Sequence, residues 1–150
     1  MKASAGILLF KRDQADVCFF LVHPGGPFWK NKDIGAWSIP KGELSAGEEP
    51  LQRARTEFEE ETGHAIDGRF IPLSPIRQKG GKVVHAWALE SDIEVTLLSS
   101  NTFDLEWPPK SGKMIRVPEV DRWEWFAYEE AKQRINPAQA PFLTEVVTFK

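Results

Sequence analysis

Cysteine is nearly absent from this sequence, since Cys18 is the one cysteine among 150 residues. A single cysteine cannot form an internal disulfide, so a disulfide scaffold is excluded and a reducing cytoplasm is the expected compartment. Cys18 stands between Val17 and Phe19, which predicts a buried strand residue rather than a reactive thiol. The sequence also lacks an apolar run of transmembrane length and a signal-peptide pattern, so no membrane partner is expected.

An excess of basic residues is missing as well. The chain has 19 Lys and Arg residues against 22 Asp and Glu residues, for a net charge of −3. Because nucleic-acid binders usually carry a basic patch or stripe, nucleic acid is not an expected partner. A nucleotide substrate stays compatible, since a bound metal ion can reverse the local potential. The histidines lack the spacing of zinc ligands, and the paired glycines match neither a P-loop nor a dinucleotide fingerprint.

What the sequence does contain predicts a single domain over residues 1–150. Hydrophobic residues make up 41% and charged residues 27%, the proportions of an ordinary globular protein. The patterns predict strands at Ala3–Phe10, Val17–Val22, Val83–Leu89 and Arg122–Phe126, with a weaker candidate at Phe70–Ile76 and a turn at Lys11–Gln14. They predict helices at Tyr128–Ile135 and from Pro137 to about Thr148, and a long loop at Ser99–Lys113. Together with an acidic helix after Pro50, these elements predict an α/β sandwich with a mixed sheet.

The acidic helix carries the most informative chemistry of the chain. Pro50 suits its first position, and Gly63 suits the left-handed residue after its last turn. At about 100° per residue, Glu57, Glu60 and Glu61 fall within an arc of roughly 100°. Like charges one turn apart destabilise a helix by about a few tenths of a kcal/mol, so the cluster predicts a missing partner. A hard divalent cation with oxygen ligands fits that role.

The segment around this helix resembles the signature of the Nudix (MutT-related) hydrolase family, G-x5-E-x7-R-E-U-x-E-E-x-G-U, where U is a bulky aliphatic residue. The matching positions are held by Gly42, Glu48, Glu57, Phe58, Glu60, Glu61 and Gly63. Two positions differ, because Thr56 stands where the family has Arg and His64 where it has an aliphatic residue. The resemblance implies a Nudix-like α/β/α sandwich with a central mixed β-sheet.

The resemblance also implies an activity. The family hydrolyses a nucleoside diphosphate linked to another group, such as a nucleoside triphosphate or a dinucleoside polyphosphate, by water attack at phosphorus with Mg²⁺ or Mn²⁺. It implies that Glu57 and Glu61 are the main metal ligands, that Glu60 assists, and that the backbone carbonyl of Lys41 contributes. Glu48 is expected to hold the preceding loop against the helix. Carboxylate-held cations can neutralise a pyrophosphate and lower the pKa of the attacking water, which agrees with this assignment.

Thr56 removes the arginine that is expected to brace the catalytic glutamates. Arg55 is adjacent in sequence, but helix geometry places its side chain about 160° from Glu57. Arg53 precedes Glu57 by one turn and lies only about 40° away, so it can reach the acidic face. The hypothesis is that Arg53 supplies the brace.

A general base or a further metal ligand is expected from outside the acidic segment. Glu119 is the first candidate, by resemblance to the Pro-Glu segment of family members that cleave polyphosphates. Asp121 and Glu124 come behind it. The alternative is that Glu119 is an exposed carboxylate in a loop before a strand.

Loop aromatics and lysines are the candidates for substrate binding. Phe28, Trp29 and Trp107 lie in loops rich in Gly or Pro, and each could stack on a nucleobase. The alternative is that they cover the edges of the core. Lys41 and Lys82 could contact phosphate, although solvated lysines are the commoner case.

Three other functions compete with a nucleotide pyrophosphohydrolase. An RNA 5′-end pyrophosphohydrolase is disfavoured by the net charge of −3, and an isoprenyl diphosphate isomerase would need further acid and base residues. A catalytically weak nucleotide-sensing module is favoured by Thr56 but opposed by the intact glutamates at 57, 60 and 61.

Overall fold

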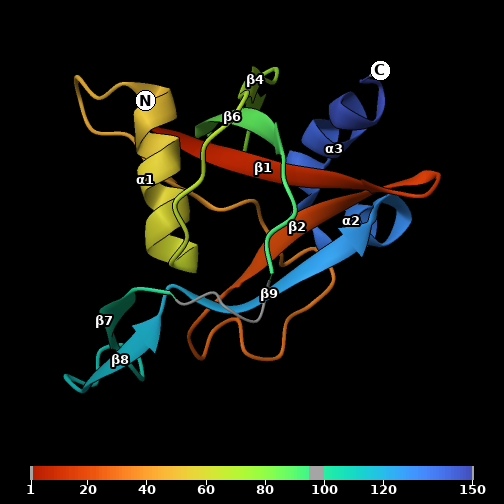
Figure 1. Cartoon of the computed structure of the whole chain (residues 1–150). Helices are drawn as coiled ribbons and strands as arrows, with labels where there is room; N and C mark the ends of the chain where they lie inside the picture. Colours follow the sequence, from red (N-terminus) through yellow and green to blue (C-terminus); the bar gives the residue numbers. More distant parts are fainter. Residues whose placement is uncertain (1, 95–99, 150) are drawn as a thin grey trace.

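Side-chain alternation along β1 (Ala3–Asp13) arranges the layers of this fold, which the computed structural model describes for residues 2–94 and 100–149. Ile7 and Leu9 point to one face of the sheet and pack in a cluster with residues of helix α1 (Pro50–Thr62). Leu8 and Phe10 point to the other face and pack beneath α2 (Tyr128–Arg134) and α3 (Ala140–Val147). A strand buried on both faces therefore lies at the centre of an α/β/α sandwich (Figure 1).

The central sheet is mixed, as the sequence predicted. Besides β1, its strands are β2 (Asp16–Pro24), β3 (Lys41–Glu43), β4 (Ile71–Pro72), β5 (Ile76–Arg77), β6 (Val83–Glu90) and β9 (Val120–Ala127). Their order is β4–β6–β1–β2–β9, and β3 and β5 pair with β1 and β6 beside this path. β1 and β6 run parallel, from Ala3 opposite Val83 to Phe10 opposite Glu90, whereas the other pairs are antiparallel.

An inserted segment separates β1 from β2 near the functional site. The two strands pair directly only from Phe10 opposite Phe19 to the hairpin turn. Toward the other end, residues 38–43 lie between them: Val22 and Ser38 exchange backbone hydrogen bonds of 2.9 Å, and the Ile7 N–H donates to Pro40 at 3.1 Å. Because the strands diverge there, β3 can present Lys41 beside the acidic helix.

The acidic helix begins and ends where its sequence predicted. The Glu49 side chain caps it by accepting from the Gln52 N–H at 2.7 Å, and Pro50 occupies the first turn. Gly63 ends the helix in a left-handed conformation with φ of 79°. Ala54 and Phe58 are fully buried against the sheet, which leaves the acidic side of the helix toward the cleft.

The hairpin between β1 and β2 is tighter than predicted. Lys11, Arg12 and Asp13 belong to β1 and pair with β2, so the predicted turn at Lys11–Gln14 is wrong. The turn lies at Gln14 and Ala15, and Gln14 adopts a φ of 56°. Polar side chains fit a strand here because this end of the hairpin extends beyond the core.

Cys18 lies in this hairpin and is half-buried, whereas the sequence predicted a buried residue. Partial burial, followed by the charges of Asp16 and Asp13, raises its thiol pKa, which agrees with an unreactive cysteine.

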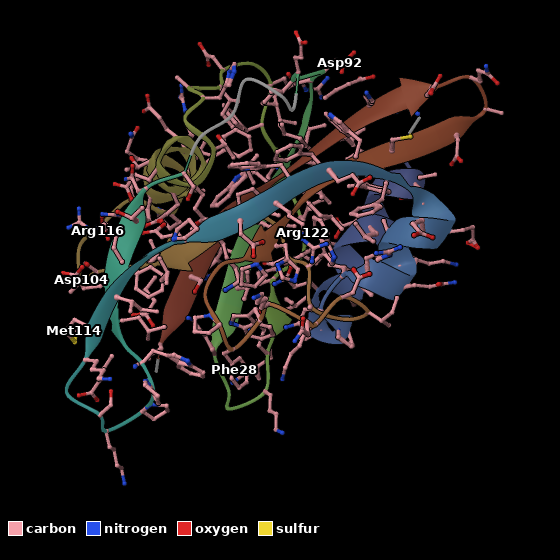
Figure 2. All side chains as sticks on the ribbon, turned by 90° about the horizontal axis from the view of Figure 1, so that it is seen from below. Phe28, Asp92, Asp104, Met114, Arg116 and Arg122 are labelled. Carbon is pink, nitrogen blue, oxygen red and sulfur yellow. The ribbon has the colours of Figure 1, made fainter. Side chains whose placement is uncertain are left out.

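The predicted long loop at Ser99–Lys113 is wrong at Thr102–Glu106, which forms a strand, whereas residues 107–113 are a loop as predicted. Ser99 itself lies outside the described residues. β7 (Thr102–Glu106) and β8 (Met114–Pro118) form a separate two-stranded hairpin (Figure 1). Charged residues and two prolines conceal its alternating pattern. Asp104 faces Arg116 across the pair, and Figure 2 shows both, together with Met114, at one edge of the molecule.

Among the described residues, no helix has the length and apolar character needed to cross a bilayer.

Candidate active site

Three carboxylates from two distant segments meet at the edge of a cleft. Glu57 and Glu61 are one turn apart on α1, and Glu119 lies in the link between β8 and β9. One carboxylate oxygen from each residue lies within 4.8 Å of the others. Glu61 is buried, with 7% of its surface exposed, and the other two are half-buried. Three negative charges this close and this poorly solvated require a positive partner.

The pKa values of the cluster carry the same information. Burial raises the pKa of Glu61 well above its usual range, and the charges of Glu57 and Glu119 raise it further. Burial is also the main cause of the raised pKa of Glu57 and of Glu119. The same burial that raises these pKa values penalises the charged carboxylates, and a bound cation would favour the ionised forms.

Lys41 brings a positive charge to the same cleft. Its side chain lines the cleft together with Glu61 and Glu119. Burial lowers the pKa of the Lys41 amine, helped by the charge of Lys82, while the charges of Glu61, Glu43 and Glu57 oppose the shift. An amine in this position can contact an anion that approaches the carboxylate cluster.

Arg53 connects the acidic helix to the loop before it. Its Nη1 donates to Glu57 Oε1 at 3.0 Å, and its Nε donates to Glu48 Oε2 at 2.8 Å. Glu48 in turn accepts from the Ser45 N–H at 2.6 Å. The contact from Arg53 to the acidic face is present as the helix geometry predicted, and its catalytic role stays a prediction. Arg55 lies on the far side of the helix, where it donates to the Ile66 carbonyl at 3.1 Å.

Thr56 also lies away from the cleft. It borders a shallow depression on the flank of α1, together with Gln52, Arg55 and Glu59. The arginine that contacts Glu57 therefore lies one turn before it, at position 53, and not at the adjacent positions 55 and 56.

Gly42 makes room for Glu57. A Cβ atom at this position would lie 2.1 Å from the Glu57 Cδ, so a side chain here would displace the Glu57 carboxylate from its present position. The glycine that opens the acidic segment thus fixes the approach of Lys41 to the carboxylates.

The cleft itself has a volume of about 270 Å³. Trp29, Val22 and Ile39 contribute apolar surface, and the polar lining beyond the carboxylates and Lys41 consists of Ser38, Gln78, Asn136 and Gln139. Gln139 is almost fully buried at 1% exposure. It accepts from the Ile39 N–H at 3.0 Å and donates to Ser38 Oγ at 3.0 Å and to Gln78 Oε1 at 3.1 Å. Sequence patterns did not single out this amide network, because its members come from three separate segments.

The other predicted site residues lie farther from the cluster. Glu60 is not part of the three-carboxylate group, although its charge contributes to the raised pKa of Glu57 and of Glu119. Phe28 does not line the cleft; it is 56% exposed and packs edge-on against Trp29, with the ring centroids 5.0 Å apart. Trp107 is on the β7–β8 hairpin, and Lys82 forms an ion pair of 3.4 Å with Glu43; neither lines the cleft.

The two fallback carboxylates are not in the cluster either. Asp121 Oδ1 lies 2.8 Å from the Nδ1 of His23, and Glu124 is exposed on β9. Glu119 is the carboxylate outside α1 that joins the group of three.

His23 is a buried residue whose position sequence reasoning missed. No part of its side chain is exposed, and its Nε2 donates to the Lys32 carbonyl at 2.6 Å. Through Asp121 it ties the loop that carries Trp29 to the start of β9, directly after Glu119. Asp121 is 98 residues away in the sequence, so local spacing carries no signal for this contact.

Comparison with known proteins matches this arrangement to one family. The model of the NUDIX domain matches residues 1–146. An octanoyltransferase from Myxococcus xanthus is 33% identical over 101 residues, which cover 67% of this chain but only 25% of that protein. The chain thus spans about a quarter of the length of this curated relative.

Solved structures show the same fold. An Ap4A hydrolase from C. elegans in a binary complex has a TM-score of 0.67 at 20% identity, covering 97% of this chain and 96% of that one. The NUDIX domain of Shewanella oneidensis NrtR complexed with ADP ribose has a TM-score of 0.64 at 13% identity, covering 97% and 85%. Identities this low establish the shared fold alone.

Proposed function

The chain belongs to the Nudix family, and on that premise we propose that it is a divalent-metal-dependent pyrophosphohydrolase. Its substrate would be a nucleoside diphosphate-linked compound, such as a nucleoside triphosphate or a dinucleoside polyphosphate, and water would attack at phosphorus. One observation carries the proposal: Glu57, Glu61 and Glu119 lie within 4.8 Å of one another at the edge of a cleft.

The donor set of this cluster fits a hard divalent cation. Carboxylate oxygens are the ligands that Mg²⁺ and Mn²⁺ prefer. Burial raises the pKa values of the three carboxyls, and a nearby cation would stabilise their charged forms. A bound cation would neutralise phosphate charge and lower the pKa of the attacking water. Glu57, Glu61 and Glu119 would hold it, with Glu60 and the Lys41 carbonyl as further ligands by family resemblance.

The other side chains of the cleft have separate tasks in this proposal. Arg53 keeps the Glu57 carboxylate oriented through its 3.0 Å hydrogen bond. The Lys41 amine binds the phosphate oxygens, because it lines the cleft beside the cluster. Glu119 is also the candidate to accept the proton of the attacking water, through the carboxylate oxygen that does not bind the cation.

The cleft supports a nucleotide as the substrate class. Trp29 offers a ring for stacking, and Gln78 and Asn136 line the same cleft with amides that can hydrogen-bond to a base. At about 270 Å³, the cleft holds part of a dinucleoside polyphosphate and leaves the rest outside. The C. elegans Ap4A hydrolase and the ADP-ribose complex of the Shewanella domain support a phosphoanhydride between two larger groups.

A product-resolved screen tests this function. The protein would be incubated with Mg²⁺ in ¹⁸O-labelled water and with nucleoside triphosphates, dinucleoside polyphosphates, ADP-ribose and a 5′-triphosphate RNA. We expect hydrolysis with ¹⁸O in one phosphoryl group of one of the two products, and no hydrolysis after chelation of the cation. The labelled phosphorus then identifies the site of attack.

The competing functions give different outcomes in the same screen. Cleavage of the RNA alone would favour the 5′-end pyrophosphohydrolase. An isoprenyl diphosphate is added to the screen for the isomerase, and its conversion without ¹⁸O incorporation would favour that function. Tight nucleotide binding without any product would favour the sensing module and contradict the proposed enzyme.

A further inference from the structure

A second cavity lies away from the carboxylate cluster and is larger than the cleft. Its volume is about 410 Å³, inside the range of roughly 300–1,000 Å³ typical of small-molecule sites. Phe10 and Arg12 reach it from the last part of β1, and Leu89 and Glu90 from the end of β6. The carboxylate cleft lies beside the first part of β1, where β3 pairs with Ser4–Gly6. The two cavities share no lining residue.

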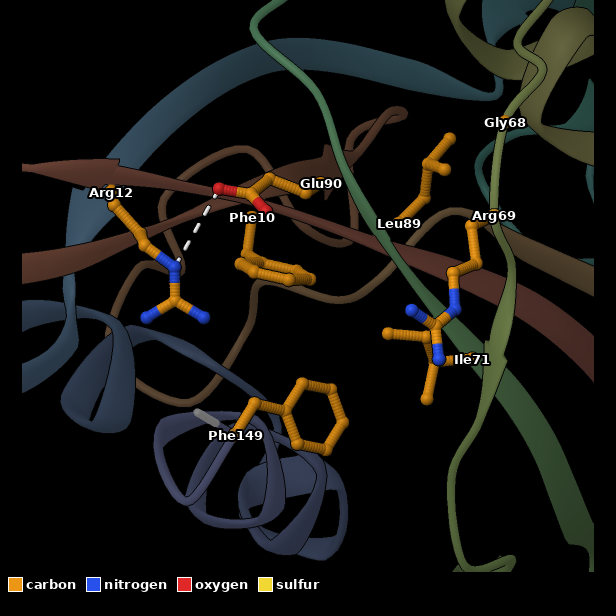
Figure 3. A pocket seen from close by; sticks show the side chains of 8 residues that line it. All are labelled: Phe10, Arg12, Gly68, Arg69, Ile71, Leu89, Glu90 and Phe149. Carbon is orange, nitrogen blue, oxygen red and sulfur yellow. Dashed lines mark ion pairs between the residues drawn. The ribbon is translucent and has the colours of Figure 1, made fainter.

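The floor of this cavity is apolar and mostly buried. Phe10 and Leu89 are each only 2% exposed, and Ile71 and Phe149 add half-buried apolar surface. The rings of Phe10 and Phe149 meet edge-on with their centroids 6.1 Å apart. Figure 3 shows these rings on one side of the opening and Ile71 on the other. A compact aromatic or branched aliphatic group would find contacts on several sides.

The rim carries two arginines, of which one is ion-paired within the described part of the chain and the other is not. Arg12 forms an ion pair of 3.6 Å with Glu90, and its guanidinium lies 5.8 Å from the centre of the Phe10 ring. Arg69 has neither an ion pair nor a hydrogen bond to any residue that the structure describes. The charged side chains that line the cavity, Arg12, Arg69 and Glu90, thus sum to one positive charge, and that charge resides on Arg69 (Figure 3).

We propose that this cavity binds a small organic anion, with a compact apolar body on the Phe10–Phe149 floor and an anionic group at Arg69. A guanidinium presents paired N–H donors that match both a carboxylate and a phosphate monoester. The apolar floor favours an anion that carries an apolar group over free inorganic phosphate. The positive charge of Arg69 favours an anion over a neutral compound. The site is separate from the proposed hydrolysis, since it uses none of the residues assigned to the cleft.

An NMR titration of the full chain labelled with ¹⁵N tests the proposal. The probes are phenylacetate and phenyl phosphate, which carry the two possible anionic groups, with neutral phenylacetamide as the matched control. We expect saturable amide shifts around residues 10–12, 68–71, 89–90 and 149 with at least one anion. We expect binding at least about tenfold weaker, or roughly 1.4 kcal/mol, for the amide. The better of the two anions identifies the head group.

Variants of an exposed residue make the test decisive, because they leave the buried floor intact. Arg69→Gln should weaken binding of the preferred anion at least about tenfold, and Arg69→Lys should restore part of it. Arg116→Gln, which removes an arginine from the β7–β8 hairpin, should leave binding unchanged. Equal binding of phenylacetamide, unchanged affinity in Arg69→Gln, or no shifts with any probe would each overturn the proposal. Hydrolysis should be unaffected by Arg69→Gln, so failure here is distinguishable from failure of the proposed function.

Discussion

Glu61 and Glu119 bring the same chemical group to one cluster, but different structures hold them. Glu61 lies one turn after Glu57 on α1, so the separation of these two side chains is a property of any helix. Glu119 lies between two strands, where its N–H donates to Asn101 at 2.9 Å and its carbonyl accepts from Gly25 at 3.0 Å. The helix therefore supplies a preformed pair of carboxylates, whereas the third carboxylate depends on contacts between distant segments.

The close packing at Gly25 illustrates that dependence. A Cβ atom on Gly25 would lie 2.0 Å from the Pro118 carbonyl oxygen. Only a glycine allows this loop to reach the backbone of Glu119. The position of the third carboxylate is thus set by the loop after β2 as much as by its own neighbours.

The largest expected effect comes from the buried member of the helix pair. Glu61→Gln keeps the size of the side chain but removes the charge that a cation needs, so turnover should fall about a thousandfold, or roughly 4 kcal/mol. Mn²⁺ affinity, measured by calorimetry, should fall in parallel. Glu59→Gln, on an exposed side of the same helix, is the matched control. Full activity in Glu61→Gln would contradict the assignment of the cluster.

Glu119→Gln tests the other side of the comparison. If Glu119 accepts the proton from water, turnover should fall more than about tenfold, or roughly 1.4 kcal/mol, with a smaller change in Mn²⁺ affinity than in Glu61→Gln. Steady-state kinetics at saturating cation measures the first quantity, and Glu124→Gln serves as control. A loss below tenfold would reduce Glu119 to a supporting position.

Arg53→Ala should have a smaller effect through Glu57. Loss of the 3.0 Å hydrogen bond frees the Glu57 carboxylate, and we expect Mn²⁺ affinity to fall about tenfold, as for other residues that orient metal ligands. Arg55→Ala removes an arginine two residues away that contacts the opposite flank and should leave cation affinity unchanged. Unchanged affinity and turnover in Arg53→Ala would end the brace hypothesis.

The smallest expected effect concerns stability in the absence of cations. Because the folded-state pKa of Glu61 lies well above the usual 4.5, its ionisation destabilises the fold as the pH rises above 4.5 toward the folded-state value. Below 4.5 the carboxyl is protonated in both states and carries no penalty. Glu61→Gln should therefore raise the melting temperature of the metal-free protein at about pH 8 but not at about pH 4. The expected rise is roughly 2–4 °C for each kcal/mol of ionisation penalty that the substitution removes. Differential scanning calorimetry with a chelator measures this, and an equal shift at both pH values would speak against the charge.

Prediction from the sequence succeeded where the determinants were local. The limits of α1 follow from Pro50 and Gly63, and the reach of Arg53 follows from turn geometry. The β7–β8 hairpin was missed because charged residues and prolines obscure its alternation. The contact of His23 with Asp121 and the Gln139 network were missed because their partners lie 61 to 101 residues away.

The sequence by itself determined the chemical character of this protein: a helix with glutamates on one side, glycines at both flanks, and the resemblance to a metal-dependent hydrolase family. A period of 3.6 residues is enough to place Glu57 beside Glu61. Only the tertiary structure decided that Glu119 completes the cluster, that Glu60 and Trp107 do not line the cleft, and that a second cavity with an unpaired arginine lies at the far end of β1. Those arrangements arise where diverging strands and packed loops bring distant residues together, and no local spacing encodes that meeting.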